Sequence, residues 1–250
     1  MSFVTQRRQE ILNRLEREER IEIAQLATDF DVSTLTIRRD LDALASQGLV
    51  RRSYGHAVLA DDALVGPAAD RERRKRAIAA YAATLVENGE IIFINTGTTA
   101  LGILEYVQAE NVTFVTNNGR ALDVLLPAAS TVILTGGEIR VPKWSMTGVF
   151  ALESLRATRA QKCFMSCSGI SAELGLTTNV TQEMRVNELM LERSAFHVVL
   201  ADSSKVGVDS SFVYGTPDVI DVLVTDSGMS DEQLRAFEAA GVRSIVRVEP

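Results

Sequence analysis

From residue 90 onward, short runs of β-branched and apolar residues alternate with segments of helical periodicity. The strand-like runs are residues 91–94, 112–115, 132–134, 163–167, 197–200, 222–224 and 245–248. The helical patterns between them lie at residues 99–107, 120–126, 150–155, 183–194 and 231–240. Strands that alternate with helices indicate a parallel sheet covered on both faces. We therefore expect a large α/β domain built on a mainly parallel sheet.

Small polar residues follow almost every one of these strand-like runs. Open parallel sheets bind ligands at the carboxyl ends of their strands, so these hydroxyls, amides and glycines would converge on one edge of the sheet. That convergence predicts a polar ligand pocket. The residues expected to line it are Asn95, Thr96, Gly97, Thr98, Thr99, Thr116, Asn117, Asn118, Gly136, Gly137, Gly169 and Lys205.

The loop at residues 95–99 has the most specific pattern of these strand ends. Gly97 lets the backbone approach an anion, and the threonine hydroxyls and the first N–H groups of the next helix add donors. Such a loop suits a single phosphoryl group, and Lys205 offers a compensating charge. The alternatives are an ordinary N-capping turn and a surface lysine. The loop is not a GxGxxG sequence and no Gly-Lys-Ser/Thr follows it, so we infer neither NAD nor ATP and expect no cofactor.

The two cysteines of the chain, Cys163 and Cys167, are too few for a disulfide framework. They lie four residues apart on one predicted strand and would face the same side as Met165. No cluster of histidines or cysteines accompanies them, so we expect buried packing and predict no metal site. His197, at the start of another strand, is expected to have a structural role.

The first sixty residues carry the pattern of a helix-turn-helix. A helix starting near Thr5 precedes a short strand at residues 21–23 and a helix at residues 24–30. Asp31 then breaks the helix, because aspartate tolerates the left-handed conformation, and Ser33 can cap the next helix. The second helix of the pair spans residues 34–46, and its predicted buried face consists of Ile37, Leu41 and Leu44.

The opposite face of this second helix is rich in groups that read DNA. Guanidinium groups can pair with guanine or phosphate, and methyl groups can contact thymine. The alternative is a solvated charged face. Two strands, residues 49–54 and 57–59, would follow as a wing, which favours DNA binding. The residues expected to contact DNA are Ser33, Thr34, Leu35, Thr36, Arg38, Arg39, Arg51, Arg52, Tyr54 and His56.

Charge divides unevenly along the chain, which has 26 basic and 33 acidic residues and a net charge of −7. Residues 1–58 hold nine arginines and nine acidic residues, so the whole negative excess lies in the remainder. DNA binding must therefore depend on local arginine clusters. A dense basic run at residues 71–76 either contacts flanking DNA or forms the solvated face of a helix that extends to residue 87.

The pattern predicts three parts: a winged helix-turn-helix domain at residues 1–58, a linker at residues 59–70 and a ligand-binding domain at residues 71–250. The linker contains glycine, proline and three aspartates, two of them adjacent at Asp61 and Asp62, and has no sustained periodicity. No apolar stretch approaches the roughly 18–20 residues that a membrane-spanning helix needs. The N-terminus also lacks the apolar segment of a signal peptide, so we expect a cytoplasmic protein without a membrane partner.

These motifs resemble the DeoR family of bacterial transcription regulators. Residues 32–58 resemble its N-terminal domain in order and spacing. The motifs at residues 96–99, 116–117, 136–137, 169–170, 175–177 and 201–207 resemble its sensor domain, which is similar in fold to ribose-5-phosphate isomerase and the CoA transferases. The resemblance implies that helix 34–46 is the recognition helix, that loop 96–99 holds the phosphate of a sugar effector and that Lys205 lines the pocket.

Four positions depart from the family's pattern. The family usually has glycine where Asp31 and His56 stand. It commonly has aspartate where Asn95 stands and lysine or arginine where Asn187 stands. The last two departures remove charges from the expected pocket, and they bear on which effector is bound.

Two functions fit these features. We expect a transcriptional regulator, a repressor of a sugar-metabolism operon, whose operator binding a phosphorylated sugar controls. The alternative is a sugar-phosphate isomerase with an appended DNA-binding module. An isomerase needs a carboxylate base, and Asn95 offers an amide, which leaves Glu183 or Asp202 for that role. Because one winged domain of zero net charge binds DNA weakly, we also expect a dimer or tetramer.

Overall fold

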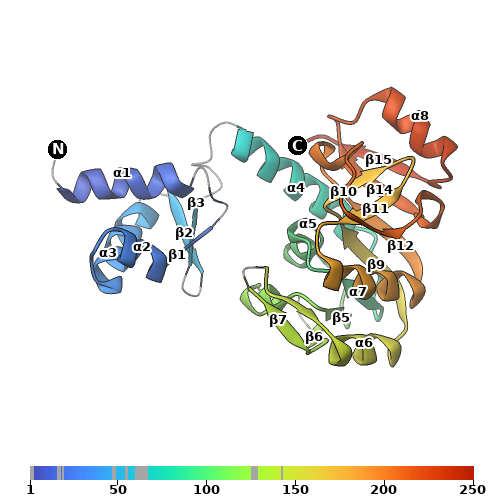
Figure 1. The fold of residues 1–250 in the computed structure, drawn as a ribbon, viewed down its shortest axis with the longest axis horizontal. Coiled ribbons are helices and arrows are strands. Elements are labelled where there is room, and N and C mark those ends of the chain that lie inside the picture. Colours follow the sequence, from blue (N-terminus) through green and yellow to red (C-terminus); the bar gives the residue numbers. More distant parts are fainter. Residues whose placement is uncertain are drawn as a thin grey trace. The chain divides into compact units, whose positions relative to one another are not determined.

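The computed structural model describes residues 3–15, 18, 20–46, 49–53, 56–59, 67–124, 129–141 and 143–250. The chain divides into two compact units, Met1–Glu72 and Arg73–Pro250 (Figure 1). Among the described helices, none combines the length and apolar character needed to cross a membrane.

The first unit is a winged helix-turn-helix. Its helices are α1 (Phe3–Leu15), α2 (Ile23–Asp29) and α3 (Thr34–Ser46). Its antiparallel sheet has the order β1-β3-β2, formed by β1 (Ile21–Glu22), β2 (Val50–Ser53) and β3 (His56–Leu59). The predicted elements are confirmed, except that α1 begins at Phe3 and contains Thr5 instead of being capped by it. The residues between β2 and β3, Tyr54 and Gly55, lie outside the described residues.

Helix α3 is fixed by its cap and its apolar face. The Ser33 hydroxyl accepts a hydrogen bond from the Thr36 N–H at 3.1 Å, as an N-cap does. The predicted inward residues Ile37, Leu41 and Leu44 are buried in the core of this unit. Asp40, also buried, accepts hydrogen bonds from Nε of Arg7 at 2.6 Å and Nε of Arg8 at 2.8 Å, so α1 and α3 are held by charge as well as by packing.

Asp31, in the turn before α3, has a φ of 50°, which places it in the left-handed region. We expect Asp31→Val to destabilise the unit by roughly 1–2 kcal/mol, because a β-branched residue tolerates this conformation poorly. Asp31→Gly should change stability little. Glycine removes the backbone strain at this φ, but its extra conformational freedom in the unfolded chain costs about 0.5–1 kcal/mol. Urea unfolding followed by far-UV circular dichroism measures both. Equal stability of the two variants would contradict a strained turn.

The second unit is built on a seven-stranded parallel sheet, as predicted. Its order is β15-β14-β12-β9-β4-β5-β6. The strands are β4 (Ile91–Ile94), β5 (Thr113–Thr116), β6 (Thr131–Leu134), β9 (Ala160–Ser166), β12 (Ser194–Leu200), β14 (Val222–Asp226) and β15 (Ile245–Val248). The chain runs outward from β4 to β6, then returns to place β9 on the other side of β4. The junction of β4 and β9 is therefore the topological switch point, where ligands bind in open sheets.

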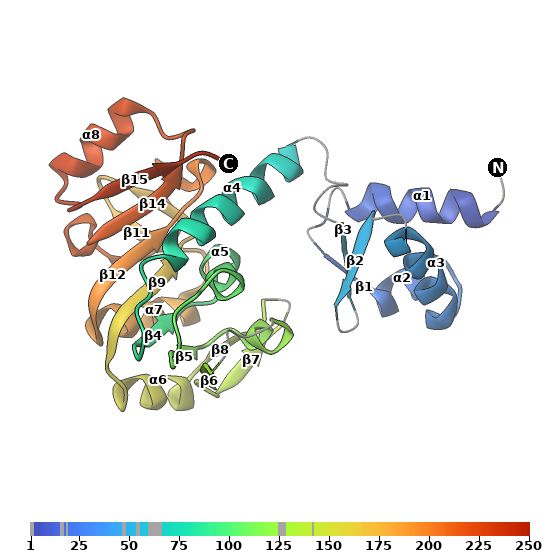
Figure 2. The same cartoon turned by 180° about the vertical axis from the view of Figure 1, so that it is seen from behind.

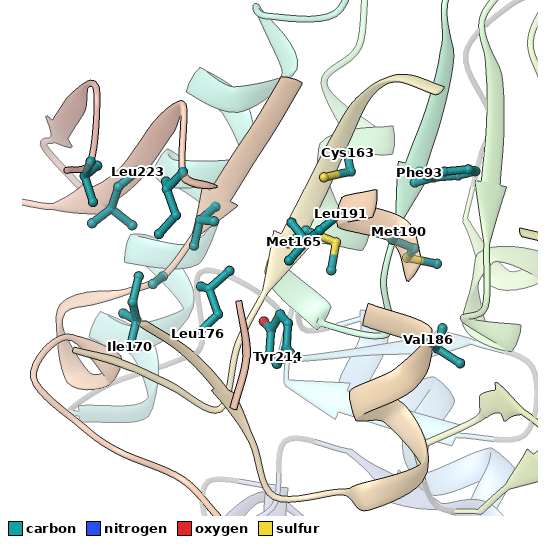
Figure 3. Packing of buried hydrophobic residues seen from close by; sticks show 14 of the residues in the cluster. Phe93, Cys163, Met165, Ile170, Leu176, Val186, Met190, Leu191, Tyr214 and Leu223 are labelled. Carbon is teal, nitrogen blue, oxygen red and sulfur yellow. The ribbon is translucent and has the colours of Figure 1, made fainter. Parts of the chain in front are cut away.

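Helices cover this sheet on both faces (Figure 2). Phe93 belongs to one buried cluster, while its neighbours Ile92 and Ile94 belong to the other, as expected when a strand is buried on both sides. The helices are α4 (Pro67–Ala83), α5 (Thr98–Leu101), α6 (Val149–Arg156), α7 (Thr181–Glu192) and α8 (Asp231–Ala239). Figure 3 shows the first cluster, in which Cys163 and Met165 of β9 lie near Met190 and Leu191 of α7.

Several elements differ from the sequence-based expectation. The predicted helix 99–107 is the short α5 followed by the 3₁₀ helix η2 (Gly102–Glu105), and residues 120–126 contribute only to the 3₁₀ helix η3 (Gly119–Asp123). Helix α4 begins at Pro67, within the stretch expected to be linker, and ends at Ala83. Linker residues 60–66 lie outside the described residues. Five short strands were not predicted: β7 (Glu138–Arg140), β8 (Ser145–Thr147), β10 (Gly169–Ser171), β11 (Gly175–Thr178) and β13 (Phe212–Gly215).

Candidate functional site

Asn95, the first residue after β4, ties the two strands of the switch point together. Its Nδ2 donates to the Ser166 carbonyl at 2.8 Å, and its Oδ1 accepts from the Ser166 N–H at 3.0 Å and from the Gly97 N–H at 3.3 Å. Asn95 is buried and uses both amide atoms within the protein. It therefore shapes the loop that follows β4.

Gly97 lies against the end of β9. A Cβ added at this position would overlap the Cβ and Oγ of Ser166 and lie 3.2 Å from its Cα. The Ser166 Oγ in turn accepts from the Ala100 N–H at 2.9 Å, which fixes the start of α5. Glycine is required here because the backbone at position 97 lies directly against the side chain of Ser166. The turn leaves Thr98 exposed and Thr96 half-buried, while Thr99 is buried.

The polar residues after β5 are completely buried and mostly engaged within the protein. Asn118 donates from Nδ2 to the Thr96 carbonyl at 3.2 Å and accepts the Arg120 N–H at its Oδ1. Thr116 accepts the Asn118 N–H at 3.1 Å. Asn117 donates from Nδ2 to the Met146 carbonyl at 3.1 Å. These side chains thus support the loop after β4 from the β5 side.

Helix α7 brings two buried polar side chains toward the same region. Asn187 accepts a hydrogen bond from Nδ2 of Asn95 at 3.3 Å, so the two pocket positions that depart from the family pattern are in contact. Glu183 lies one turn earlier on α7, on the same face, and its Oε2 is 3.7 Å from Nζ of Lys143. Tyr214 donates to the Ser166 carbonyl at 3.2 Å. Burial raises the pKa of Tyr214 well above its usual value, and the nearby charge of Glu183 contributes to that rise.

Three acceptor atoms near these elements are buried and have no hydrogen-bond partner among the described residues. They are Oε1 of Glu183, Oδ1 of Asn117 and Oγ of Ser145. Ser145 begins β8 and pairs with Asn118 through an isolated bridge, and β8 packs against α7. Buried acceptors usually have donors, so these three atoms keep unused capacity to accept hydrogen bonds.

Lys205 lies at the end of β12 in the 3₁₀ helix η4 (Ser203–Lys205). Burial raises the pKa of the Cys167 thiol to about 12. The charge of Lys205 lowers this pKa, and the smaller effect of Asp202 raises it. Lys205 is therefore within electrostatic range of the end of β9. Burial likewise raises the pKa of Cys163 to about 12. Both thiols stay protonated at neutral pH, in keeping with the packing role predicted for them.

The remaining predicted glycines follow β6 and β9. Gly136 and Gly137 follow β6, the edge strand, which is two strands from β4. A Cβ at Gly137 would overlap the Thr147 carbonyl oxygen, so this glycine allows close packing against β8. Gly169 begins β10, and a Cβ at this position would overlap the Val208 carbonyl oxygen.

We call Asn95–Thr99, Ser166, Glu183, Asn187 and Lys205 the switch-point site. Ser166 was not predicted, because the expected strand ran on to Cys167 and nothing in the sequence marks its true end. Asn187 was noted only as a departure from the family pattern and Glu183 only as a possible base. Tyr214 gave no signal, because its hydroxyl reaches Ser166 across 48 positions of sequence.

In the first unit, the outward face of α3 is accessible. Ser33, Thr34, Arg38 and Arg39 are exposed, and Leu35 is 56% exposed. Thr36 is half-buried and its hydroxyl lies 2.9 Å from that of Ser33. On the wing, the backbone of Arg51 and Arg52 lies in β2 and half-buried His56 begins β3. Tyr54, the other predicted wing contact, lies outside the described residues.

A winged helix-turn-helix followed by an α/β unit with a polar switch-point site defines a class of DNA-binding regulator. The models of two family domains match this chain: the DeoR-like helix-turn-helix domain at residues 7–63 and the DeoR C-terminal sensor domain at residues 70–227. The chain therefore belongs to the DeoR family of transcriptional regulators. Membership of this family favours the regulator over the isomerase as the function of the chain.

Relatives in this family match almost the whole chain. The HTH-type transcriptional regulator GolR of Listeria innocua is 30% identical over 96% of this chain and 97% of its own length. The HTH-type transcriptional regulator GlpR of Haloferax volcanii is 31% identical over 88% of this chain and 89% of its own length. The glycerol-3-phosphate regulon repressor of Escherichia coli is 29% identical, covering 89% of this chain and 91% of that protein.

Solved structures with similar folds are more distant. Ribose 5-phosphate isomerase from Plasmodium falciparum has a TM-score of 0.37 and 15% identity, covering 52% of this chain and 51% of that chain. The probable sor operon regulator from Shigella flexneri has a TM-score of 0.45 and 12% identity, covering 65% of this chain and 88% of that chain. Likenesses at this level carry no argument about function.

Proposed function

We propose that this chain is a repressor of a sugar-metabolism operon and that a phosphorylated sugar in the switch-point site controls its binding to operator DNA. Residues 1–58 serve as the DNA-binding domain, residues 59–70 as the linker and residues 71–250 as the effector-binding domain. Because its partner is chromosomal DNA, the protein acts in the cytoplasm. One relative is named as a glycerol-3-phosphate regulon repressor, and glycerol-3-phosphate carries a phosphate on a polyol.

The observation that carries the effector proposal is the close fit of Gly97 against Ser166. It produces a tight turn whose exposed hydroxyl is Thr98, at the edge where parallel sheets bind ligands. At the start of α5 the Ala100 N–H already donates to the Ser166 Oγ, so the N–H groups of Thr98 and Thr99 are the ones suited to an anion. Lys205, near the end of β9, supplies the opposite charge. Asn95 supports this loop and is assigned a positioning role.

The rest of the effector would lie toward α7. Sugar hydroxyls can donate to the three buried acceptors without partners, above all to Glu183. An anion alone offers no such donors. The site thus suits a ligand with a phosphate at one end and hydroxyl groups at the other.

Effector and operator are linked through the assembly of the protein. The first 58 residues carry no net charge, so a single copy gains little electrostatic affinity for DNA. We propose a dimer or tetramer that reads a repeated operator, with Arg38, Arg39 and the wing residues at the DNA. Sedimentation equilibrium tests this directly, and a monomer that binds operator tightly would rule it out.

A thermal-shift panel of pentose and hexose monophosphates tests the effector. A ligand at 100 times its Kd stabilises the folded state by about 2.7 kcal/mol, which should raise Tm by roughly 5–10 °C. Thr98→Val should weaken binding of the best ligand by roughly 10- to 150-fold. This range corresponds to the loss of one hydrogen bond to a charged group, which contributes about 1.5–3 kcal/mol. It should leave binding to DNA in the absence of ligand intact.

Thr131→Val is the matched control. Thr131 is exposed and lies at the amino-terminal end of β6, whereas the proposed ligand site lies at the carboxyl ends of the strands. Its ligand affinity should equal that of the parent. If no sugar phosphate shifts Tm, or if both valine variants bind equally well, the switch-point site is not the effector site.

A further inference from the structure

Arg74 of helix α4 contacts the turn that carries Lys205. Its Nη1 donates to the Ser203 hydroxyl at 3.1 Å, and its Nε lies 3.7 Å from Oδ1 of Asp226. Ser203 is the first residue of η4, and Lys205 is the last. The contact joins residues 129 positions apart in sequence. Arg74 is thus attached to a strand-end turn of the proposed effector site.

The turn itself is tightly braced. Asp226, 1% exposed, accepts the Ser203 N–H at 2.6 Å and the Gly228 N–H at 2.9 Å. A Cβ at Gly228 would lie 2.5 Å from the Ser203 Oγ, so Ser203 has no free space on that side. A displacement of η4 must therefore move Ser203 together with its partners, and one of those partners is Arg74.

We propose that Arg74 couples the effector site to the DNA-binding domain. Effector held by Lys205 shifts η4, and Arg74 transmits that shift to α4, the helix that begins at Pro67 within the linker and continues into the effector-binding domain. This inference rests on the proposed function, because it takes Lys205 as an effector contact. Arg74 does not touch the effector and acts only through Ser203 and Asp226.

A merely structural role for Arg74 predicts a different pattern. Asp226 keeps two backbone N–H donors when the guanidinium is removed, so its buried charge stays hydrogen-bonded. The side chain of Arg74 is 35% exposed, and its Nε lies 3.7 Å from Oδ1 of Asp226, beyond hydrogen-bond distance, so it adds little to the bonds that already satisfy Asp226. Removing it should therefore leave folding and ligand binding nearly unchanged while it breaks the link between the sites.

The test uses the full chain, a DNA duplex selected in vitro by the parent protein and the sugar monophosphate that gives the largest thermal shift. In the parent, saturating ligand should change the Kd for this duplex by about 5- to 150-fold, the usual range for coupled sites. In Arg74→Met, the ligand Kd should stay within about threefold of the parent, and the ligand effect on DNA binding should fall below about twofold. Arg74→Lys, which keeps the charge, should retain part of the response.

Two further variants make the result decisive. Arg71→Met removes a charge from an exposed position one turn earlier on α4 and should respond to ligand like the parent. Ser203→Ala removes the acceptor for Nη1 without changing charge and should weaken the response even if Arg74→Met fails to fold.

The two proposals fail in different ways. If Arg74→Met and Ser203→Ala both bind ligand, and if ligand changes their Kd for DNA as it does in the parent, the coupling role is wrong and the effector site stands. If the parent binds no sugar phosphate at all, the proposed effector is wrong and the coupling falls with it.

Discussion

Replacing Gly97 with alanine is expected to abolish ligand binding and to destabilise the second unit by about 3 kcal/mol, the upper end of the usual cost of overpacking. The new Cβ would overlap the Cβ and Oγ of Ser166, and because the backbone fixes the position of the Ser166 Cβ, no rotamer relieves the clash. Either the loop after β4 or the end of β9 must move. The Asn95 hydrogen bonds to Ser166 would then be lost as well.

Urea unfolding followed by the fluorescence of Trp144, the single tryptophan, measures this effect in the second unit. Gly102→Ala is the matched control, because a Cβ there would meet only the Ala79 Cβ at 3.4 Å, an ordinary contact. The double variant Gly97→Ala with Ser166→Gly should recover part of the stability, since it removes the overlapping atoms but also the acceptor for the Ala100 N–H. Identical unfolding midpoints for Gly97→Ala and Gly102→Ala would refute the close fit.

The seven strands of the main sheet could be predicted from their apolar runs, and central strands such as β4 and β5 are buried on both faces. Burial on both sides requires a continuous apolar run, as in Ile91–Ile94, and such runs stand out without an alignment. The helix-turn-helix was predictable for a related reason, since the spacing of Ile37, Leu41 and Leu44 defines one buried face. The five additional strands have three or four residues each and carry no comparable pattern.

The gathering of polar side chains at the carboxyl ends of the strands could be predicted, but their contacts only in part. The rule that ligands bind at the carboxyl ends of strands treats every polar residue there as a ligand contact. Asn118 instead bonds to the loop after β4, and Thr116 accepts the Asn118 N–H of its own segment, and only the structure distinguishes these uses from ligand contacts. Contacts between distant segments gave no signal. Asn95 and Asn187 each attracted notice alone, but their pairing spans 92 positions.

In the first unit, Arg39→Ala is expected to weaken binding to the selected duplex by roughly 5- to 150-fold, because one bidentate contact to a base is worth about 1–3 kcal/mol. Arg39 is exposed on α3, opposite the buried Ile37, so its removal should change folding stability by less than about 0.5 kcal/mol. Ligand affinity should be unaffected. Fluorescence anisotropy with the labelled duplex measures the change.

The salt dependence of binding separates the two ways in which Arg39 can act. A guanidinium on phosphate weakens binding to all sequences alike, and its loss lowers the slope of log K against log salt by about 1. A guanidinium on a base edge leaves that slope nearly unchanged and relaxes the preference at one position. Arg20→Ala removes the same charge from a half-buried position between α1 and β1 and serves as the control. Since the first 58 residues have zero net charge, a general charge effect would make both variants equally weak, and that result would exclude α3 as the reading helix.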